Sequence, residues 1–291
     1  MGRPRLGIAL GSGSARGWAH IGVLRALQAA GLEPDLVCGT SIGAFVGAAY
    51  ASGDLDRLET WVRGLTRRDV LGFFDVGVAG GLIKGEKLLS FASEAFLDED
   101  FSALDRPFAC VATDLANGRE VWLKEGSVAE AVRASIALPG LFAPHCVDDR
   151  VLVDGGLVNP VPVSLCRALG AEVVIAVDLS LDVINHRYRR GEQAAATTGW
   201  RGRIGRWLGR RSGDDPYRPS LPDVLSSSIA IMQGRISRSR LAGEPADVLI
   251  TPRLAHLGPL DYHRGEEAMA AGRKAAEHML PLLHSHLEPF L

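Results

Sequence analysis

Short apolar runs alternate with helical patterns along this chain, and that alternation limits it to few folds. The runs Leu6–Leu10 and Leu36–Cys38 each lead through a glycine-bearing turn into a helical pattern, and Glu172–Asp178 (EVVIAVD) is apolar over most of its length. Near-continuous apolar strands are typical of parallel sheets, which are buried on both faces. Strands that alternate with helices form a mostly parallel sheet with helices packed on it. The sequence therefore predicts an α/β fold.

The remaining elements are predicted from the spacing of apolar residues and from turn signals. The dipeptide Asn117-Gly118 is typical of a tight hairpin turn between two strands. We expect further strands at Phe108–Thr113, Glu120–Leu123, Val151–Val153 and Val248–Thr251. We expect helices at Ala19–Ala30, Val128–Ser135, Pro162–Leu169, Asp223–Leu241 and Gly265–His286.

Ser41 is the central residue of the segment GTSIG, which runs from Gly39 to Gly43. An apolar run precedes this segment and a helical pattern of small residues follows it. A strand that turns sharply on one serine and continues as a helix is a nucleophile elbow. The flanking glycines let the turn close without side-chain clashes, and the start of the helix favours negative charge at the serine. This segment predicts acyl transfer by Ser41.

Three glycine-bearing turns follow predicted strands: the loop Gly11–Gly17, the elbow at Ser41 and the sequence Asp154-Gly155-Gly156. In a parallel α/β sheet the ligand lies beyond the carboxyl ends of the strands, so we expect all three turns to emerge at that edge and converge. Ser41 would supply a nucleophile, Asp154 a carboxylate that orients or deprotonates it, and the first loop a row of N–H groups for an oxyanion.

Four segments together match the motifs of one family. They are Leu10–Leu24 (LGSGSARGWAHIGVL), Gly39–Gly43, Ser135–Asp178 (beginning SIALPGLF) and Ser220–Leu254. On these motifs the chain resembles the small bacterial patatin-like phospholipases. The resemblance covers most of the chain outside an arginine-rich segment, and the combination of motifs is highly specific. It implies a three-layer α/β/α patatin-like fold with a mostly parallel sheet, in a single domain over residues 1–291.

The resemblance also assigns roles by position. It makes Ser41 the nucleophile and Asp154 the carboxylate of a Ser–Asp dyad without histidine, and it makes the glycine-rich loop the oxyanion hole, with Arg16 in its basic position. Ser12 and Ser14 stand where the family often has glycine. A serine keeps its N–H, so the hole can form, but serine is less favourable than glycine at a positive φ. The open question is therefore the catalytic rate and not the fold. The site residues expected around the dyad are Gly11, Ser12, Gly13, Ser14, Arg16, Gly17, Gly39, Gly43, Gly155 and Gly156.

The activity that the resemblance implies is hydrolysis of lipid acyl esters, such as phospholipids and lysophospholipids, with no cofactor and no metal. Ser41 would attack the ester carbonyl while Asp154 accepts its proton, and water would then clear the acyl-enzyme. Burial would have to raise the carboxylate pKa from about 3.9 to make it a useful base. The alternative is a non-catalytic regulatory or scaffold protein that keeps the fold.

Two other enzyme classes are weaker interpretations. The loop at Gly11 resembles the start of a dinucleotide-binding motif, but its third glycine comes at Gly17 and no acidic residue ends the second strand. An α/β-hydrolase could complete a triad with His256 or His263. Its elbow, however, normally follows several strands, whereas only 38 residues precede Gly39 here.

Composition bears on compartment and partners. A net charge of −2 gives no reason to expect nucleic acid as a partner. The four cysteines are widely spaced without a CxxC pair, which indicates reduced thiols packed mostly in the core. No apolar run approaches the ~18 residues of a membrane span, and the N-terminal run is too short for a signal peptide. These features predict a cytoplasmic protein.

One segment departs from the rest in composition. Residues 185–213 contain eight arginines and one acidic residue, together with Trp200 and Trp207. On a helix, the two tryptophans share a face from which most of the arginines are absent. The segment is predicted to be either a peripheral contact with an anionic membrane surface or a solvated insertion.

Overall fold

A computed structural model of the protein describes residues 3–73, 100–181 and 221–287. The strands are β1 (Leu6–Leu10), β2 (Leu36–Thr40), β3 (Phe108–Asp114), β4 (Glu120–Leu123), β5 (His145–Val147), β6 (Arg150–Asp154), β7 (Val173–Val177) and β8 (Val248–Ile250). The α-helices are α1 (Ala19–Ala29), α2 (Ile42–Ala51), α3 (Leu55–Gly64), α4 (Arg67–Phe73), α6 (Val128–Ser135), α7 (Val163–Ala168), α10 (Leu221–Gly243) and α11 (Gly265–Leu287). Short 3₁₀ helices are η1 (Ser14–Trp18), η3 (Phe101–Ala103), η4 (Gly155–Leu157) and η5 (Tyr262–Arg264).

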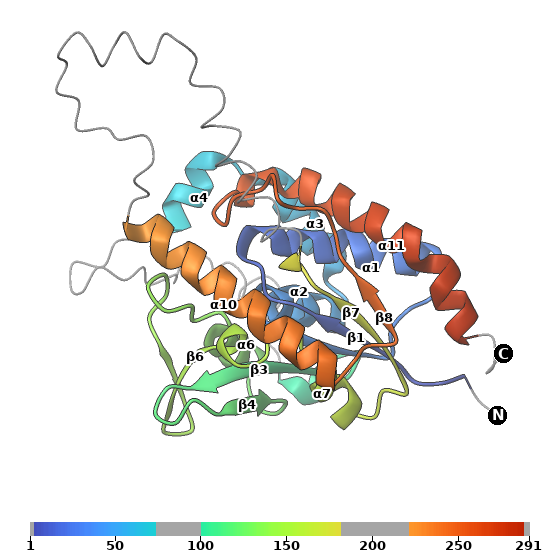
Figure 1. Ribbon diagram of the computed structural model, residues 1–291, viewed down its shortest axis with the longest axis horizontal. Coiled ribbons are helices and arrows are strands. Elements are labelled where there is room, and N and C mark those ends of the chain that lie inside the picture. The colour runs from blue at the N-terminus through green and yellow to red at the C-terminus, as the bar shows by residue number, and fades with distance from the viewer. Residues whose placement is uncertain (1–2, 74–99, 182–220, 288–291) are drawn as a thin grey trace, which may run out of the picture.

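All of these strands join one sheet at the centre of the molecule (Figure 1). Its order is β5-β6-β3-β2-β1-β7-β8, and β4 pairs separately with β3. Five strands are parallel to one another, namely β3, β2, β1, β7 and β8. The pairs that involve β4, β5 and β6 are antiparallel. The predicted, mostly parallel sheet is therefore confirmed, with an antiparallel portion next to β3.

Helices cover both faces of the sheet. Side chains along a strand point alternately to opposite faces, so an apolar strand needs a covering layer on each face. On β1, Ile8 packs in a core cluster with α1, α2, α3, α6 and α11, while its neighbour Ala9 packs in a second cluster with α7 and with Leu241 of α10. This gives the three-layer α/β/α arrangement that the resemblance implies.

Two glycines let α1 and α11 approach each other closely along the upper face in Figure 1. A Cβ atom on Gly22 of α1 would lie 1.9 Å from the carbonyl oxygen of Met269, and one on Gly272 of α11 would lie 1.9 Å from that of Ala19. Any larger residue at either position would push the helices apart.

The pairing of β3 sets the geometry of the site. Residues 108–111 of β3 pair with β2, residues 112–114 pair with β6, and residues 110–113 pair with β4. Some of the β3 residues that pair with β4 also pair with β2 or with β6. Because a strand has only two edges, β4 must lie along one edge of β3 while β2 and β6 share the other. There they point toward each other and meet end to end, with Thr40 opposite Val111 and Asp154 opposite Ala112.

This arrangement corrects one expectation. Asp154 does not reach the site by leaving the carboxyl edge of a parallel strand, because β6 runs antiparallel to β3 and therefore opposite to β1 and β2. The three predicted turns still converge, since β6 starts beyond the end of β2 and runs back toward it.

Most other predicted elements are confirmed to within a few residues, including the hairpin of β3 and β4. The second half of the predicted glycine-rich loop forms the 3₁₀ helix η1, which leads into α1, and helices α3 and α4 and strand β5 had not been predicted. The four cysteines are free, and Cys38, Cys110 and Cys166 are buried. The arginine-rich segment 185–213 lies outside the described residues. Of the helices that are described, none has both the length and the apolar content needed to cross a membrane.

Candidate active site

Ser41 occupies a strained turn between β2 and α2. Its φ of 57° lies in the left-handed region, which residues with a side chain rarely adopt. The two glycines of the elbow are required by close packing: a Cβ on Gly39 would lie 2.4 Å from the Gly43 carbonyl oxygen, and one on Gly43 would lie 2.1 Å from that of Leu10. The segment predicted as a nucleophile elbow therefore has the geometry of one.

The side chain of Ser135 in α6 forms hydrogen bonds that fix this elbow. Its hydroxyl accepts a hydrogen bond from the Ser41 N–H at 2.9 Å and donates one to the Val111 carbonyl at 2.7 Å, and its side chain is fully buried. Because β2 ends at this point, neither the Ser41 N–H nor the Val111 carbonyl has a hydrogen-bond partner between β2 and β3. The Ser135 hydroxyl pairs with both of them. The sequence motif begins at Ser135, but nothing in the spacing of residues indicated this role.

Asp154 contacts Ser41 directly. The Ser41 hydroxyl donates to Oδ2 of Asp154 at 2.6 Å, and the N–H of Gly156 donates to Oδ1 at 2.7 Å. The carboxylate therefore braces its own Asp-Gly-Gly turn and faces the serine at the same time. A Cβ on Gly155 would lie 2.1 Å from the Val111 carbonyl oxygen, so this turn also depends on glycine.

The Asp154 side chain is almost fully buried, at 1% exposure. Desolvation raises its pKa to about 6, although the hydrogen bonds from Ser41 and Gly156 act in the opposite direction. At neutral pH the carboxylate is therefore charged but is a stronger base than an exposed aspartate. This agrees with the expected effect of burial.

The first part of the glycine-rich loop is fixed to the sheet. The Gly11 N–H donates to Val177 at 3.0 Å and the Ser12 N–H to Pro160 at 2.9 Å, both through the carbonyl oxygen. The Gly11 carbonyl accepts a 2.7 Å hydrogen bond from Nε2 of His20, whose pKa burial lowers to about 4, so the ring is neutral. The N–H groups of Gly11 and Ser12 therefore already have hydrogen-bond partners within the protein.

Farther along, the Ala15 N–H donates to the carbonyl of Pro259 at 3.2 Å, and the Arg16 N–H donates to that of Gly13 at 3.2 Å. Among the residues that the structure describes, no acceptor pairs with the N–H of Gly13 or of Ser14. Of the row of N–H groups predicted from the sequence, these two remain for a ligand.

Two residues of this loop, Ser14 and Arg16, differ in what the structure shows of them. Ser14 has a φ of 51°, so one of the two serines that replace glycine does lie at a left-handed position. Arg16 is buried at 6% exposure and its Nε donates to the Leu257 carbonyl at 3.0 Å. This contact makes Arg16 a brace between the loop and the C-terminal part of the chain.

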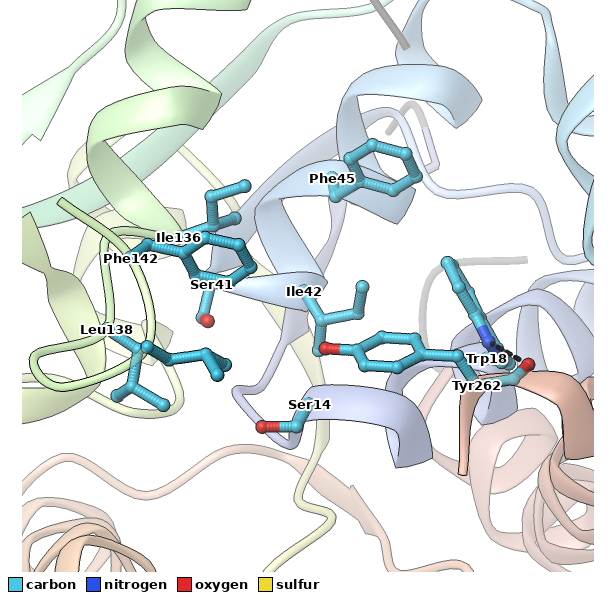
Figure 2. A pocket seen from close by; sticks show the side chains of 10 residues that line it. Ser14, Trp18, Ser41, Ile42, Phe45, Ile136, Leu138, Phe142 and Tyr262 are labelled. Carbon is cyan, nitrogen blue, oxygen red and sulfur yellow. Dashed lines mark hydrogen bonds between the residues drawn. The ribbon is translucent and has the colours of Figure 1, made fainter. Parts of the chain in front are cut away.

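A pocket opens beside the Ser41 hydroxyl (Figure 2). It encloses about 410 Å³, including its open mouth. The hydroxyl side chains that line it are Ser14, Ser41 and Tyr262, and Trp18 contributes an aromatic face. Its other lining residues are apolar, namely Ile42, Phe45, Ile136, Leu138, Leu141 and Phe142. The arrangement suits a carbonyl at the hydroxyls and an apolar chain beyond it.

The two histidines of the rival triad have other partners. Nε2 of His256 lies 3.7 Å from a carboxylate oxygen of Glu267, and Nε2 of His263 accepts a hydrogen bond from Arg67 at 3.1 Å. Both carboxylate oxygens of Asp154 are used without either of them. A Ser–Asp–His triad is therefore not assembled in the described part of the chain.

Comparisons with known proteins bear on the family of this chain. A family model described as patatin-like phospholipase matches residues 8–167. An uncharacterized NTE family protein of Mycobacterium tuberculosis is 34% identical, and the match covers 95% of this chain and 91% of that protein. Lysophospholipase NTE1 of Coccidioides immitis is 29% identical over 96% of this chain, which corresponds to 18% of its own length. Human patatin-like phospholipase domain-containing protein 6 is 37% identical over 60% of this chain and 13% of its own length.

Among solved structures, VipD from Legionella pneumophila has a TM-score of 0.57 at 15% identity, covering 98% of this chain and 67% of that chain. At this identity the likeness concerns the fold alone.

Proposed function

The chain belongs to the patatin-like phospholipase family, and we propose that it is a serine acyl hydrolase that cleaves lipid esters with a Ser41–Asp154 dyad. The observation that carries the proposal is the 2.6 Å hydrogen bond from the strained Ser41 to a carboxylate that is almost fully buried. A serine needs a base to become a nucleophile, and Asp154 is in direct reach of its proton.

In the acylation step, Ser41 Oγ attacks the ester carbonyl while its proton passes to Oδ2 of Asp154. The carbonyl oxygen becomes an oxyanion, for which the N–H groups of Gly13 and Ser14 are the available donors. The tetrahedral intermediate then expels the alcohol, which takes the proton from Asp154, and an ester of Ser41 remains.

In the deacylation step, water attacks the Ser41 ester and Asp154 accepts the proton of that water. The second tetrahedral intermediate then breaks its bond to Ser41 Oγ and releases the free acid, while Asp154 returns the proton to Ser41 Oγ. A base with a pKa near 6 is charged at neutral pH, so the same carboxylate can serve in both steps.

The pocket and the relatives support a proposal for the substrate class. The apolar side chains beyond Ser41 suit a fatty acyl chain, which is excluded from water when bound. The relative from Coccidioides immitis is named a lysophospholipase, and we propose lysophospholipids and phospholipids as substrates of this chain.

Hydrolysis of short and long p-nitrophenyl acyl esters and of lysophospholipid, by the wild type, Ser41→Ala and Asp154→Ala, tests the proposal. We expect both variants to fold and to lose activity, and we expect a fluorophosphonate probe to label the wild type but not Ser41→Ala. Activity that persists in Ser41→Ala would rule out the mechanism. A folded wild type without activity or labelling would favour the scaffold alternative.

A peripheral contact with anionic membranes through residues 185–213 stays a prediction. It requires that vesicles containing anionic lipid bind the full chain better than a chain that lacks this segment.

A further inference from the structure

Tyr262 brings a third hydroxyl to the pocket from a distant part of the sequence. It begins the 3₁₀ helix η5, just before α11, whereas Ser14 and Ser41 follow β1 and β2. Figure 2 shows its phenol group pointing from the side of Trp18 toward Ser14 and Ser41, and all three hydroxyl residues line the pocket.

The position of Tyr262 is held by its surroundings. Its carbonyl oxygen accepts a hydrogen bond from Nε1 of Trp18 at 3.1 Å, drawn as a dashed line in Figure 2. Its ring packs edge-on against Trp18, with 5.8 Å between ring centroids, and the residue is only 8% exposed. The phenol oxygen is therefore preorganised at the wall of the pocket and does not have to be ordered by the substrate.

The phenol stays protonated in this environment. Burial and the nearby charge of Asp154 raise the pKa of Tyr262 above its ordinary value, while the interaction with the Ser14 hydroxyl acts in the opposite direction. A phenol can accept one hydrogen bond and still donate its own hydrogen. A hydrogen bond that the phenol accepts from Ser14 therefore leaves its own hydrogen for the pocket.

We propose that Tyr262 is a further catalytic residue, whose phenol donates a hydrogen bond to the oxyanion formed when Ser41 attacks. This inference rests on the proposed acyl hydrolase function. The phenol would act together with the N–H groups of Gly13 and Ser14. Because a charged oxygen accepts a stronger hydrogen bond than a neutral carbonyl, the contact favours the transition state over the bound ester.

The variant Tyr262→Phe tests this, because it removes the hydroxyl and keeps the ring against Trp18. We expect kcat on p-nitrophenyl esters to fall by about 100-fold, the usual scale for one lost oxyanion donor, with KM within about threefold of the wild type. Tyr50→Phe is the matched control. Its phenol is also buried, but it has no hydrogen-bond partner among the described residues and lies on α2 away from the pocket. We expect this variant to retain the wild-type kcat.

A second measurement separates direct donation from support of the loop. Ser14→Gly removes the hydroxyl beside the phenol, and glycine adopts the left-handed φ without support. If Tyr262 contacts the oxyanion, Tyr262→Phe costs the same factor in kcat in the Ser14→Gly background as in the wild type. If it only holds Ser14 in place, the cost disappears in that background, and the proposal is overturned.

Other outcomes also decide the matter. A Tyr262→Phe variant with kcat within about threefold of the wild type, or with a change confined to KM, would overturn the inference and leave the dyad untouched. The proposed function fails separately, if hydrolysis by the wild type does not depend on Ser41.

Discussion

Thr40 and Asp154 lie opposite consecutive residues of β3, Val111 and Ala112. The strands that they end approach from opposite directions along one edge of β3, so the residue after Thr40 meets the carboxylate of Asp154 at 2.6 Å. The backbone register of a buried sheet thus fixes the distance between the proposed nucleophile and its base. A change in strand pairing that shifted either strand by one residue would separate them.

The pH dependence of hydrolysis is expected to report Asp154. Burial raises its pKa to about 6, and only the charged form can accept the Ser41 proton. We expect kcat/KM to be constant from about pH 7 to 8, to be halved near pH 6 and to fall about tenfold per pH unit below that. A profile that follows a group with a pKa near 4, or that is unchanged in Asp154→Asn, would contradict the role given to this carboxylate.

The variant Asp154→Asn is expected to lose activity and gain stability. The amide cannot accept the Ser41 proton, so kcat/KM should fall by roughly 10²- to 10⁴-fold. The folded-state pKa of Asp154 is above the value of 3.8 for an unperturbed aspartate, so its charged form costs folding free energy at neutral pH, and this cost vanishes as the pH falls through 6 toward 4. Thermal unfolding should therefore give a higher Tm for the variant at pH 8, and the difference should shrink at pH 5.

The variant Ser135→Ala should lower both stability and kcat. It leaves the buried Ser41 N–H and Val111 carbonyl without partners, each at a cost of about 1–3 kcal/mol, and it frees the strained elbow. Ser237→Ala is the matched control, because Ser237 is equally buried and its hydroxyl donates to Asp178 at 2.6 Å.

We expect both variants to unfold at lower urea concentration, and only Ser135→Ala to lose about 10-fold or more in kcat at conditions where both are folded. Equal kcat values for the two variants would show that Ser135 serves the fold alone.

The contact between α1 and α11 predicts a strong effect of single methyl groups. Gly272→Ala places a Cβ 1.9 Å from the Ala19 carbonyl oxygen and should cost about 3 kcal/mol or more in the free energy of unfolding. Gly64→Ala in α3 is the control, since no atom lies within 4 Å of the added Cβ and alanine favours helix by up to about 1 kcal/mol. Urea unfolding of both variants measures the difference; similar stabilities would mean that the two helices can separate without cost.

The left-handed φ of Ser14 predicts opposite effects of two substitutions. Ser14→Gly should leave the free energy of unfolding unchanged or raise it by up to about 1 kcal/mol, with activity within about threefold of the wild type. Ser14→Val should lower it by about 2 kcal/mol, because a β-branched residue is poorly accommodated at this φ. Thermal unfolding checks both, and a stable Ser14→Val variant would mean that the loop relaxes from this conformation.

Local patterns in the sequence were enough to predict much of the fold and the candidate site. The bounds of β1, β4 and α6 agree with the spacing of their apolar residues, because that spacing follows from the geometry of each strand or helix by itself. The elbow at Ser41 could be recognised for the same reason, since one glycine two residues before the serine and one two residues after it specify a turn whose geometry is local. Helix α3 was not predicted, although its buried residues Leu55, Leu58 and Val62 are spaced as on one face of a helix.

The contacts across the site were not available from such patterns. A strand's sequence repeats every two residues whichever way it runs, so Arg150–Asp154 gave no sign that β6 is antiparallel and meets β2 end to end. Ser135 ends a predicted helix and Tyr262 lies outside every predicted element, and the positions of both depend on packing between segments far apart in the chain. The sequence by itself determined which residues carry the chemistry of the proposed dyad and which segments form strands and helices. Only the tertiary structure decided how Ser41 meets Asp154, which N–H groups stay free and which hydroxyls border the pocket, because strand pairing and the desolvation of Asp154 exist only when distant segments are packed together.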